Sequence, residues 1–326
     1  MMIPGIMAQR RATGGDPPFA LRVLVAGVVE AQASLYNADT GEDLSAQIAT
    51  KPPSSARAVA VNSLRTIAAF GSTGSPYLTL YNTADWSLIT PPTQPGAIYS
   101  VAFSPDGTKL AVGSSVAPRL RLYNTADWSA IAIAEPPSPG TTNAVAFSPD
   151  SSVLVAVGTS TYLAVYNAND GSKIAQPAGV AGSGLSAAYT KGGAVLAVGH
   201  ANAPYLTLFD SSTWASISLA APPAYNVTGL ASSPDGTLLA AASNYTPYVY
   251  TWNTADWSKR AAPAVIPPNT GHSAAFSHDG SKIAIGHYSG TSAAPVAMIY
   301  DAATMAAQQA MPVQFSSRYG YGVAFL

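Results

Sequence analysis

Short apolar runs separated by turn residues extend along almost the whole chain. One stretch shows the pattern, with Tyr99 to Phe103, Leu110 to Gly113, Arg119 to Tyr123 and Ala130 to Ala134 as apolar segments and Ser104-Pro-Asp-Gly107 as a turn. Such runs between clusters of Pro, Gly, Asn and Asp predict β-strands, and no segment shows the periodicity of an amphipathic helix. The runs are apolar at successive positions, so we expect sheets that are covered on both faces.

Two landmarks repeat along the chain. The segment Tyr-Asn-Thr-Ala-Asp-Trp-Ser starts at Tyr81 and Tyr123, and related segments, 42 to 48 residues apart, start at Tyr36, Tyr166, Phe209, Trp252 and Tyr300. The segment Val-Ala-Phe-Ser-Pro-Asp-Gly starts at Val101, with counterparts at Val59, Val145, Ala187, Leu230, Ala274 and Val323. A period of this length predicts an array of supersecondary units, and each unit holds four antiparallel strands, a to d.

The two ends of the sequence predict that the array closes on itself. Val323 to Leu326 is an innermost strand a with no b, c or d after it. The chain begins with strands b, c and d of a unit that lacks its own strand a. These strands are Leu21 to Ala26, Ala33 to Asn37 and Leu44 to Ile48. Joining them completes a seventh unit and removes open sheet edges. The sequence therefore predicts an all-β protein, with one seven-bladed β-propeller over residues 21–326 and a flexible N-terminal arm over residues 1–20.

The repeat resembles those of WD-repeat and YVTN-type seven-bladed propellers. The resemblance rests on the Val-Ala-Phe-Ser-Pro-Asp-Gly and Leu-Arg-Leu-Tyr-Asn segments and covers about residues 21–326. The Trp-Asp pair that names WD repeats is replaced by pairs such as Tyr81-Asn82, and the Gly-His pair stands only at Gly271-His272. The chain is thus WD-like. Some related propellers are lactonase-type hydrolases whose chemistry lies at the central channel.

Composition narrows the classes of partner. The formal net charge is -1, and charged residues make up 10% of the chain, against about 25% in typical proteins. No basic run indicates nucleic acid, and no apolar run is long enough to predict membrane insertion. The chain has no cysteine, so disulfides and thiolate metal sites are impossible. Arg10-Arg11 is not followed by an apolar core, so we interpret the first residues as an unprocessed arm.

The titratable residues predict no catalytic, cofactor or metal site. Most aspartates occupy two repeated turn positions, at Asp106, Asp150, Asp235 and Asp279 and at Asp39, Asp85, Asp127, Asp170, Asp210, Asp256 and Asp301. Because Asp favours such turns, their role is expected to be structural. His200 and His287 lie two blades apart, and only three glutamates are present. The strands a contribute mainly Ala, Val, Ser and Phe to the centre, which predicts no acid, base or ligand there.

One face of the ring is the candidate interaction surface. The loops from b to c and the connections from d to a share that face, and they carry tyrosines and prolines with little charge. The candidate residues are Tyr77, Tyr162, Tyr205, Tyr248, Pro92, Pro137, Pro223 and Arg119. Stiff loops lower the ordering cost of binding, and tyrosine supplies large contact area. The repeated Trp86, Trp128, Trp214 and Trp257 are expected to pack against the neighbouring blade instead.

The favoured function is a non-enzymatic scaffold that presents this face, and the N-terminal arm, to other proteins of an assembly. Its cysteine-free, charge-poor composition resembles that of phage structural proteins, so we expect a virion component, either a capsid decoration or a tail or fibre part. The bacterial cytoplasm is the alternative location. The alternative function is a small-molecule or glycan binder, or a lactonase-like hydrolase, at the central channel. Convergent polar groups there would favour it.

Overall fold

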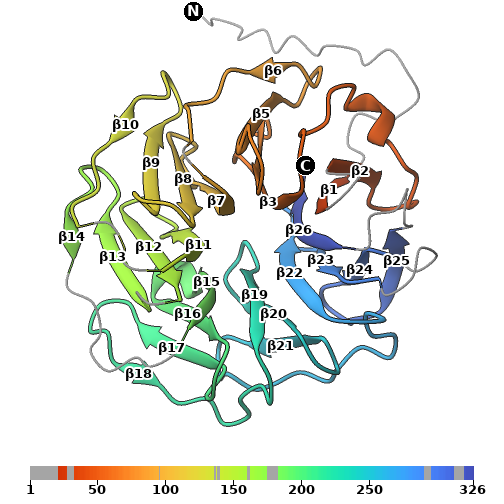
Figure 1. The fold of residues 1–326 in the computed structure, drawn as a ribbon. Coiled ribbons are helices and arrows are strands. Elements are labelled where there is room, and N and C mark those ends of the chain that lie inside the picture. The colour runs from red at the N-terminus through yellow and green to blue at the C-terminus, as the bar shows by residue number, and fades with distance from the viewer. Residues whose placement is uncertain are drawn as a thin grey trace, which may run out of the picture.

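The computed structural model is a ring of antiparallel β-sheets around a central axis (Figure 1). It describes residues 21–27, 33–94, 96–135, 137, 140–159, 162–174, 183–289, 295–311 and 319–326. The predicted N-terminal arm, residues 1–20, lies outside the described residues. The predicted all-β, seven-bladed propeller is confirmed.

Six blades follow one another along the chain. Blade one is β3 (Ala56–Val61), β4 (Ile67–Ser72), β5 (Leu78–Asn82) and β6 (Leu88–Ile89), and blade two is β7 (Ile98–Phe103), β8 (Lys109–Ser114), β9 (Leu120–Asn124) and β10 (Ala130–Ile131). Blade three is β11 (Thr142–Phe147), β12 (Val153–Gly158), β13 (Leu163–Asn167) and β14 (Lys173–Ile174), and blade four is β15 (Gly184–Thr190), β16 (Val195–His200), β17 (Leu206–Asp210) and β18 (Ser216–Ile217), with a 3-10 turn η2 (Lys191–Gly193). Blade five is β19 (Val227–Ser232), β20 (Leu238–Ser243) and β21 (Val249–Asn253), and blade six is β22 (Gly271–Phe276), β23 (Lys282–His287), β24 (Ala297–Asp301) and β25 (Ala307–Met311).

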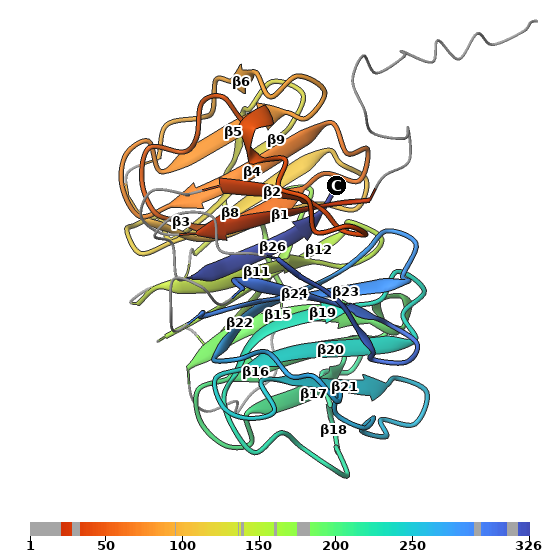
Figure 2. The same cartoon turned by 90° about the vertical axis from the view of Figure 1, so that its right-hand side faces the viewer.

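Blade seven joins the two ends of the described chain. It consists of β26 (Gly320–Phe325), β1 (Arg22–Gly27) and β2 (Ala33–Asn37), in the sheet order β2-β1-β26. Val23 pairs with Phe325 and Val25 with Val323, and Figure 2 shows β26 beside β1. The innermost strands then contact one another in a closed circle, β3 to β7, β11, β15, β19, β22, β26 and back to β3. The predicted closure by the last residues is therefore confirmed.

Two outer strands differ from the prediction. The strand expected at Leu44 to Ile48 is instead a 3-10 turn, η1 (Ser45–Gln47), and only a bridge between Tyr36 and Asp43 marks the outer edge of blade seven. In blade five the outer edge is likewise a bridge, between Trp252 and Lys259. An outermost strand packs against the fewest neighbours, so local turn geometry there can replace regular pairing.

Neighbouring blades approach closely and are hydrogen-bonded near the axis. A Cβ on Gly71 would lie 2.4 Å from Ile98 Cγ2 of the next blade, so the close approach requires a glycine. Ser100 Oγ of β7 accepts from the Val145 amide of β11 at 3.0 Å. Ser186 Oγ of β15 donates to the Val227 carbonyl of β19 at 3.1 Å. These bonds tie the innermost strands of successive blades together.

The repeated aspartates shape turns, as predicted. In the turn between the first two strands of blade three, Ser148 Oγ donates to Asp150 Oδ1 at 2.5 Å, and the Ser152 amide donates to the same oxygen at 3.1 Å. The same arrangement holds Asp106, Asp235 and Asp279. In the turn between the outer strands of blade four, Asp210 accepts from the Ser212 and Thr213 amides.

The repeated tryptophans occupy a left-handed backbone position. Seven residues at equivalent positions of the outer turns have φ between 57° and 73°, namely Gly41, Trp86, Trp128, Gly171, Trp214, Trp257 and Met305. A bulky residue is rare in this conformation, which costs about 1–2 kcal/mol. Burial offsets that cost at Trp86 and Trp257, each only 7% exposed. At Gly171 a Cβ would lie 2.0 Å from the Ala132 carbonyl oxygen, so blade three has no room for a side chain.

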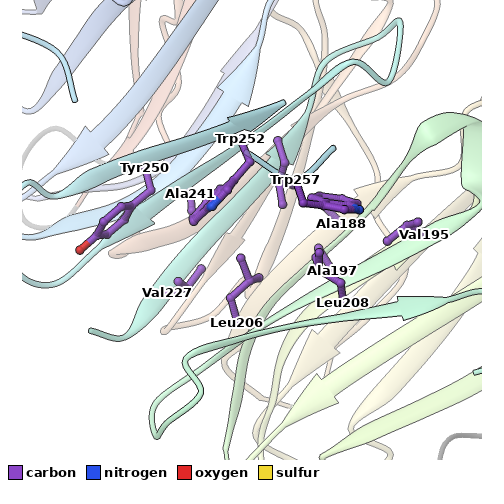
Figure 3. Packing of buried hydrophobic residues seen from close by; sticks show 11 residues of the cluster. Ala188, Val195, Ala197, Leu206, Leu208, Val227, Ala241, Tyr250, Trp252 and Trp257 are labelled. Carbon is purple, nitrogen blue, oxygen red and sulfur yellow. The ribbon is translucent and has the colours of Figure 1, made fainter. Parts of the chain in front are cut away.

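Figure 3 shows how such a tryptophan joins two blades. Trp257 of blade five reaches toward Ala188 and Ala197 of blade four, within one buried cluster that also contains Leu208 and Trp252. Trp86 of blade one lies in a cluster with Leu24 and Leu35 of blade seven. For Trp86 and Trp257 the predicted packing against the neighbouring blade is confirmed.

The left-handed backbone at Trp86 predicts how substitutions there change the stability of the protein. Trp86→Ala loses the buried ring but keeps the strained backbone, so we expect it to lower the free energy of unfolding by about 3–5 kcal/mol. Trp86→Gly loses the same ring but relieves the strain, so it should be the more stable variant by about 1 kcal/mol. Urea denaturation of both proteins measures the order. An alanine variant as stable as the glycine variant would contradict the strain at this position.

An aspartate of the outer turns also predicts how the stability of the fold changes at acidic pH. Hydrogen bonds from Ser212 and Thr213 lower the pKa of Asp210 from 3.8 to about 2. Because the folded-state pKa is depressed, this carboxylate stabilises the fold above about pH 4, and its contribution is lost as the pH falls toward about 2. Five blades have asparagine at this position, at Asn37, Asn82, Asn124, Asn167 and Asn253. Asp210→Asn should therefore keep the turn and show a shallower loss of stability between pH 4 and pH 2 than the wild type.

Urea unfolding at several pH values in that window measures the slope for each protein. The reverse exchange, Asn167→Asp, serves as the matched control and should make the slope steeper, because it adds a carboxylate at the same turn position in blade three. Identical slopes for all three proteins would show that folding does not lower the pKa of Asp210.

Candidate interaction face

The candidate face is formed by the loops between the second and third strands of the blades and by the connections that lead into the innermost strands. We call it the loop face. Four of the predicted residues occupy one repeated position at the base of these loops. The carbonyl groups of Tyr77, Arg119, Tyr205 and Tyr248 accept from the last residues of β4, β8, β16 and β20 at 2.7–2.9 Å. Each of these side chains is partly exposed. Their shared position follows from loop geometry, and their side chains remain candidates for binding.

Tyr162 combines a structural contact with partial exposure. Its ring stacks on the ring of His200, with centroids 5.0 Å apart, and its hydroxyl is hydrogen-bonded to the imidazole at 2.8 Å. His200 is fully buried, and burial lowers its pKa to about 4. Thr207 Oγ1 lies 2.9 Å from His200 Nε2. Tyr162 therefore covers a neutral, buried histidine in blade four.

The predicted prolines divide into two groups. Pro92 is partly exposed, whereas Pro137 and Pro223 are buried. The two buried prolines can stiffen the connections behind the face, but they offer no contact area of their own.

The structure shows a ring of residues at the axis that the sequence analysis missed. In each innermost strand one residue has no partner in the register, because a β-bulge interrupts the pairing there. In blade one, for example, Ala56 pairs with Ser72 and Ala58 with Gly71, which leaves Arg57 unpaired. The seven residues of this bulge ring are Arg57, Tyr99, Asn143, Leu185, Thr228, His272 and Tyr321.

The bulge ring differs from the residues expected at the centre, which were mainly Ala, Val, Ser and Phe. Its seven residues are all partly exposed, and they lie where each innermost strand begins, next to the loop face. The expectation that the strands a bring no acid, base or ligand to the axis was wrong, because the bulge presents one extra side chain per blade. Bulges often re-aim a side chain beside a functional site.

Four neighbouring blades carry the cationic and aromatic members of the ring. We call His272, Tyr321, Arg57 and Tyr99 the cationic–aromatic arc, in their order from blade six to blade two. The Arg57 guanidinium carbon lies 4.6 Å from the Tyr321 ring centroid and 5.5 Å from that of Tyr99. The His272 ring centroid lies 4.7 Å from that of Tyr321, and Tyr319 stacks on Tyr321 at 4.9 Å.

Two of the other bulge residues hold neighbouring blades together. Asn143 Nδ2 of blade three donates to the Gly184 carbonyl of blade four at 2.8 Å. Thr228 Oγ1 of blade five donates to the Gly271 carbonyl of blade six at 2.7 Å. Hydrogen bonding thus occupies the polar side chains outside the arc, while the arc itself has free polar atoms. Among the residues that the structure describes, Arg57 Nε and His272 Nε2 are enclosed and have no hydrogen-bond partner.

Burial sets the charge of the histidines near the axis. It lowers the pKa of His272 to about 4, with smaller effects from His287 and Arg57. Burial likewise lowers the pKa of His287, which is fully enclosed at the end of β23, to about 4. At neutral pH both imidazoles are therefore uncharged, and Arg57 is the charged member of the arc.

An exposed aromatic pair lies on the loop face of blade five. Tyr225 and Tyr245 are 42% and 56% exposed, and their rings stack with centroids 4.6 Å apart. The equivalent pair in blade one is Ser54 and Gly74, joined by a 2.9 Å hydrogen bond. Small residues therefore suffice to close this pair of loops. The two tyrosines add aromatic surface beyond what the loop requires.

A hollow of about 360 Å³ opens on the opposite face, between blades three and four. It is lined by Asp150, Tyr189 and Trp214 among others, and it adjoins η2, which replaces the usual Pro-Asp-Gly turn. The Asp150 carboxylate in this hollow already accepts hydrogen bonds from Ser148 and Ser152.

Across the described residues, no three His, Asp or Glu side chains gather in a group that could hold a metal ion. The part of the chain that the structure describes also contains no helix long and apolar enough to cross a membrane.

A sequence signal existed for both missed features. Aligning the repeat on Val59, Val101 and their counterparts places the bulge residues in a single column, two positions upstream. That column varies from Arg to Leu, whereas the neighbouring core columns keep similar residues. Tyr225 and Tyr245 likewise differ from their counterparts in blade one. In a repeat protein, positions that depart from the common pattern are the ones that geometry does not explain.

Comparison with known proteins identifies the repeats. Residues 87–123 and 218–251 match the family model of the WD domain, G-beta repeat. The first match runs from β6 to β9 and the second from the end of blade four into β21. No curated protein matches the chain. Two segments of the seven-bladed β-propeller are thus similar to WD40 repeats.

Proposed function

We propose that this protein is a non-enzymatic scaffold that binds partner proteins through its loop face. The observation that carries the proposal is the exposed, stacked pair of Tyr225 and Tyr245. Aromatic residues dominate the binding energy of protein interfaces, and tyrosine combines apolar area with a polar hydroxyl. Val116, 44% exposed, occupies in blade two the loop position that Tyr245 holds in blade five. Large apolar side chains are thus exposed on more than one blade of this face.

The turn aspartates and two of the histidines support a role without catalysis. The turn aspartates are hydrogen-bonded to the serines and threonines of their own turns, on the face opposite the loops. His200 and His287 are fully buried. General acid–base catalysis requires groups that reach a substrate with matched pKa values, and these residues are committed to the fold instead.

A binding comparison tests the loop face. Wild type, a Tyr225→Ser/Tyr245→Ser double variant and a Leu64→Ser variant would be used to capture proteins from an extract of the source organism. Leu64 is 74% exposed in the turn between β3 and β4, on the opposite face, and provides the matched control. We expect the double variant to lose a partner's binding by roughly tenfold or more, because an aromatic hot spot contributes about 2 kcal/mol.

The Leu64→Ser variant should retain that partner at the wild-type level, and thermal unfolding should show that all three proteins are folded. The affinity for the partner would be measured with purified proteins. Loss of binding in the Leu64→Ser variant, with none in the double variant, would place the interface on the opposite face.

The more specific form of the proposal places the protein in a phage particle, as a decoration or tail component. Its support is compositional: a cysteine-free chain with 10% charged residues and 27 glycines and 26 prolines. Quantitative mass spectrometry of purified particles and of the cytoplasmic fraction of infected cells tests the location. We expect a fixed copy number in the particles. Recovery in the cytoplasmic fraction alone would favour a bacterial scaffold.

A second candidate function is supported by the cationic–aromatic arc. A small-molecule or glycan binder at the axis requires convergent polar groups, and Arg57, His272 and Tyr321 converge there. A small ligand would occupy the arc without involving Tyr225 or Tyr245. The double variant therefore separates the two functions, because it should leave binding of a small ligand unchanged.

A further inference from the structure

We propose that the cationic–aromatic arc is a carboxylate-binding site for an acidic segment of the partner protein, with Arg57 as the anion-binding residue. The proposal rests on the proposed scaffold function and names the chemistry of the partner. It concerns residues at the axis, whereas the exposed tyrosine pair lies on the loops of blade five.

Arg57 carries a positive charge that the described residues do not neutralise. Lys173 pairs with Glu135 and Lys282 with Asp39, whereas no ion pair of Arg57 is found among the described residues. The guanidinium carbon lies 5.5 Å from the Tyr99 ring centroid and 4.6 Å from that of Tyr321. Its Nε atom is enclosed without a partner, although the residue as a whole is partly exposed. A partly desolvated guanidinium held in one orientation is well suited to a carboxylate.

The neighbouring groups favour a singly charged anion. His272 is neutral at physiological pH because burial lowers its pKa to about 4. The arc therefore supplies one positive charge, from Arg57, together with the hydroxyl of Tyr321 and the unpartnered Nε2 of His272. A phosphate dianion would retain an uncompensated charge there. A carboxylate is matched by one guanidinium.

The aromatic rings favour a peptide over a sugar. Tyr319 and Tyr321 are nearly parallel, with an angle of 3° between their planes, and Arg57 also packs against the Tyr321 ring. Tyr321 is therefore covered by Tyr319 and Arg57, whereas sugar binding by an aromatic residue needs an open ring face. Blade five, which carries the exposed tyrosine pair, is next to blade six, which carries His272. A peptide whose carboxylate contacts Arg57 could continue across the loop face to this pair.

Peptide titration followed by NMR tests the site directly, with the protein labelled with ¹⁵N arginine. The probes are Ac-Ala-Asp-Ala-NH₂, Ac-Ala-Asn-Ala with a free C-terminal carboxylate, neutral Ac-Ala-Asn-Ala-NH₂, and glucuronate. The Nε–H signal of Arg57 is assigned by its absence in Arg57→Gln. We expect a carboxylate-bearing peptide to shift this signal and to bind roughly tenfold or more tightly than the neutral peptide. The side-chain and C-terminal probes show which source of carboxylate fits.

Three variants provide the controls. Arg57→Gln should lose the preference for the charged peptide, while Arg57→Lys keeps the charge but not the planar pair of donors and should bind with intermediate affinity. Arg65→Gln changes an exposed arginine in the turn between β3 and β4 and should bind as the wild type does. Backbone amide spectra establish that each variant is folded.

Equal binding of the charged and neutral peptides, or unchanged binding by Arg57→Gln, would overturn the proposal. Binding of glucuronate without binding of either acidic peptide would instead identify an acidic-sugar site. The partner comparison separates this result from the scaffold function. If partner binding depends on Tyr225 and Tyr245 but not on Arg57, the scaffold proposal stands and the carboxylate site does not.

Discussion

The structure depends on the burial of both faces of every sheet. A blade such as β11 to β14 is apolar on each side, because Leu154 and Val155, successive residues of β12 that point to opposite faces, are both fully buried. Such a sheet is stable only between two others, and a linear array would leave its end sheets uncovered. Pairing of β26 with β1 solves this by forming blade seven from both ends of the described chain. Each blade then has two neighbours.

Closing seven sheets around an axis restricts the residues at repeated positions. Gly71 lets blade two approach blade one, and Gly171 fits beneath a backbone carbonyl of the preceding blade. Trp86 and Trp257 fill the space between blades even though their backbone is left-handed. The turn aspartates accept hydrogen bonds from hydroxyl and amide groups of their own turns. Repetition in this chain therefore reflects packing and turn geometry.

Candidate binding residues are found where the repeat is broken. Arg57, Tyr225 and Tyr245 each replace a different residue type at the equivalent position of other blades. Their side chains are partly or largely exposed, and they lie on the loop face or at the end of the axis beside it. The closed ring of packed blades fixes where the backbone of these residues lies. This arrangement suits a scaffold, because little ordering is required when a partner binds.

The sequence alone determined the number of blades, the strand order within them and the closure by the last residues. The repeat length gives the number of units, and the unmatched strands at the two ends can be paired only if the ring closes. It also indicated the roles of Asp150 and Trp257, since turn chemistry and apolar burial are local preferences. Tertiary structure alone decided that Arg57 lies between Tyr99 and Tyr321, and that His272 of blade six lies next to Tyr321. Alternation along a strand does not reveal a bulge, because the unpaired residue is defined by the register of the adjacent strand. The neighbours in the arc come from opposite ends of the chain, and only ring closure brings them together.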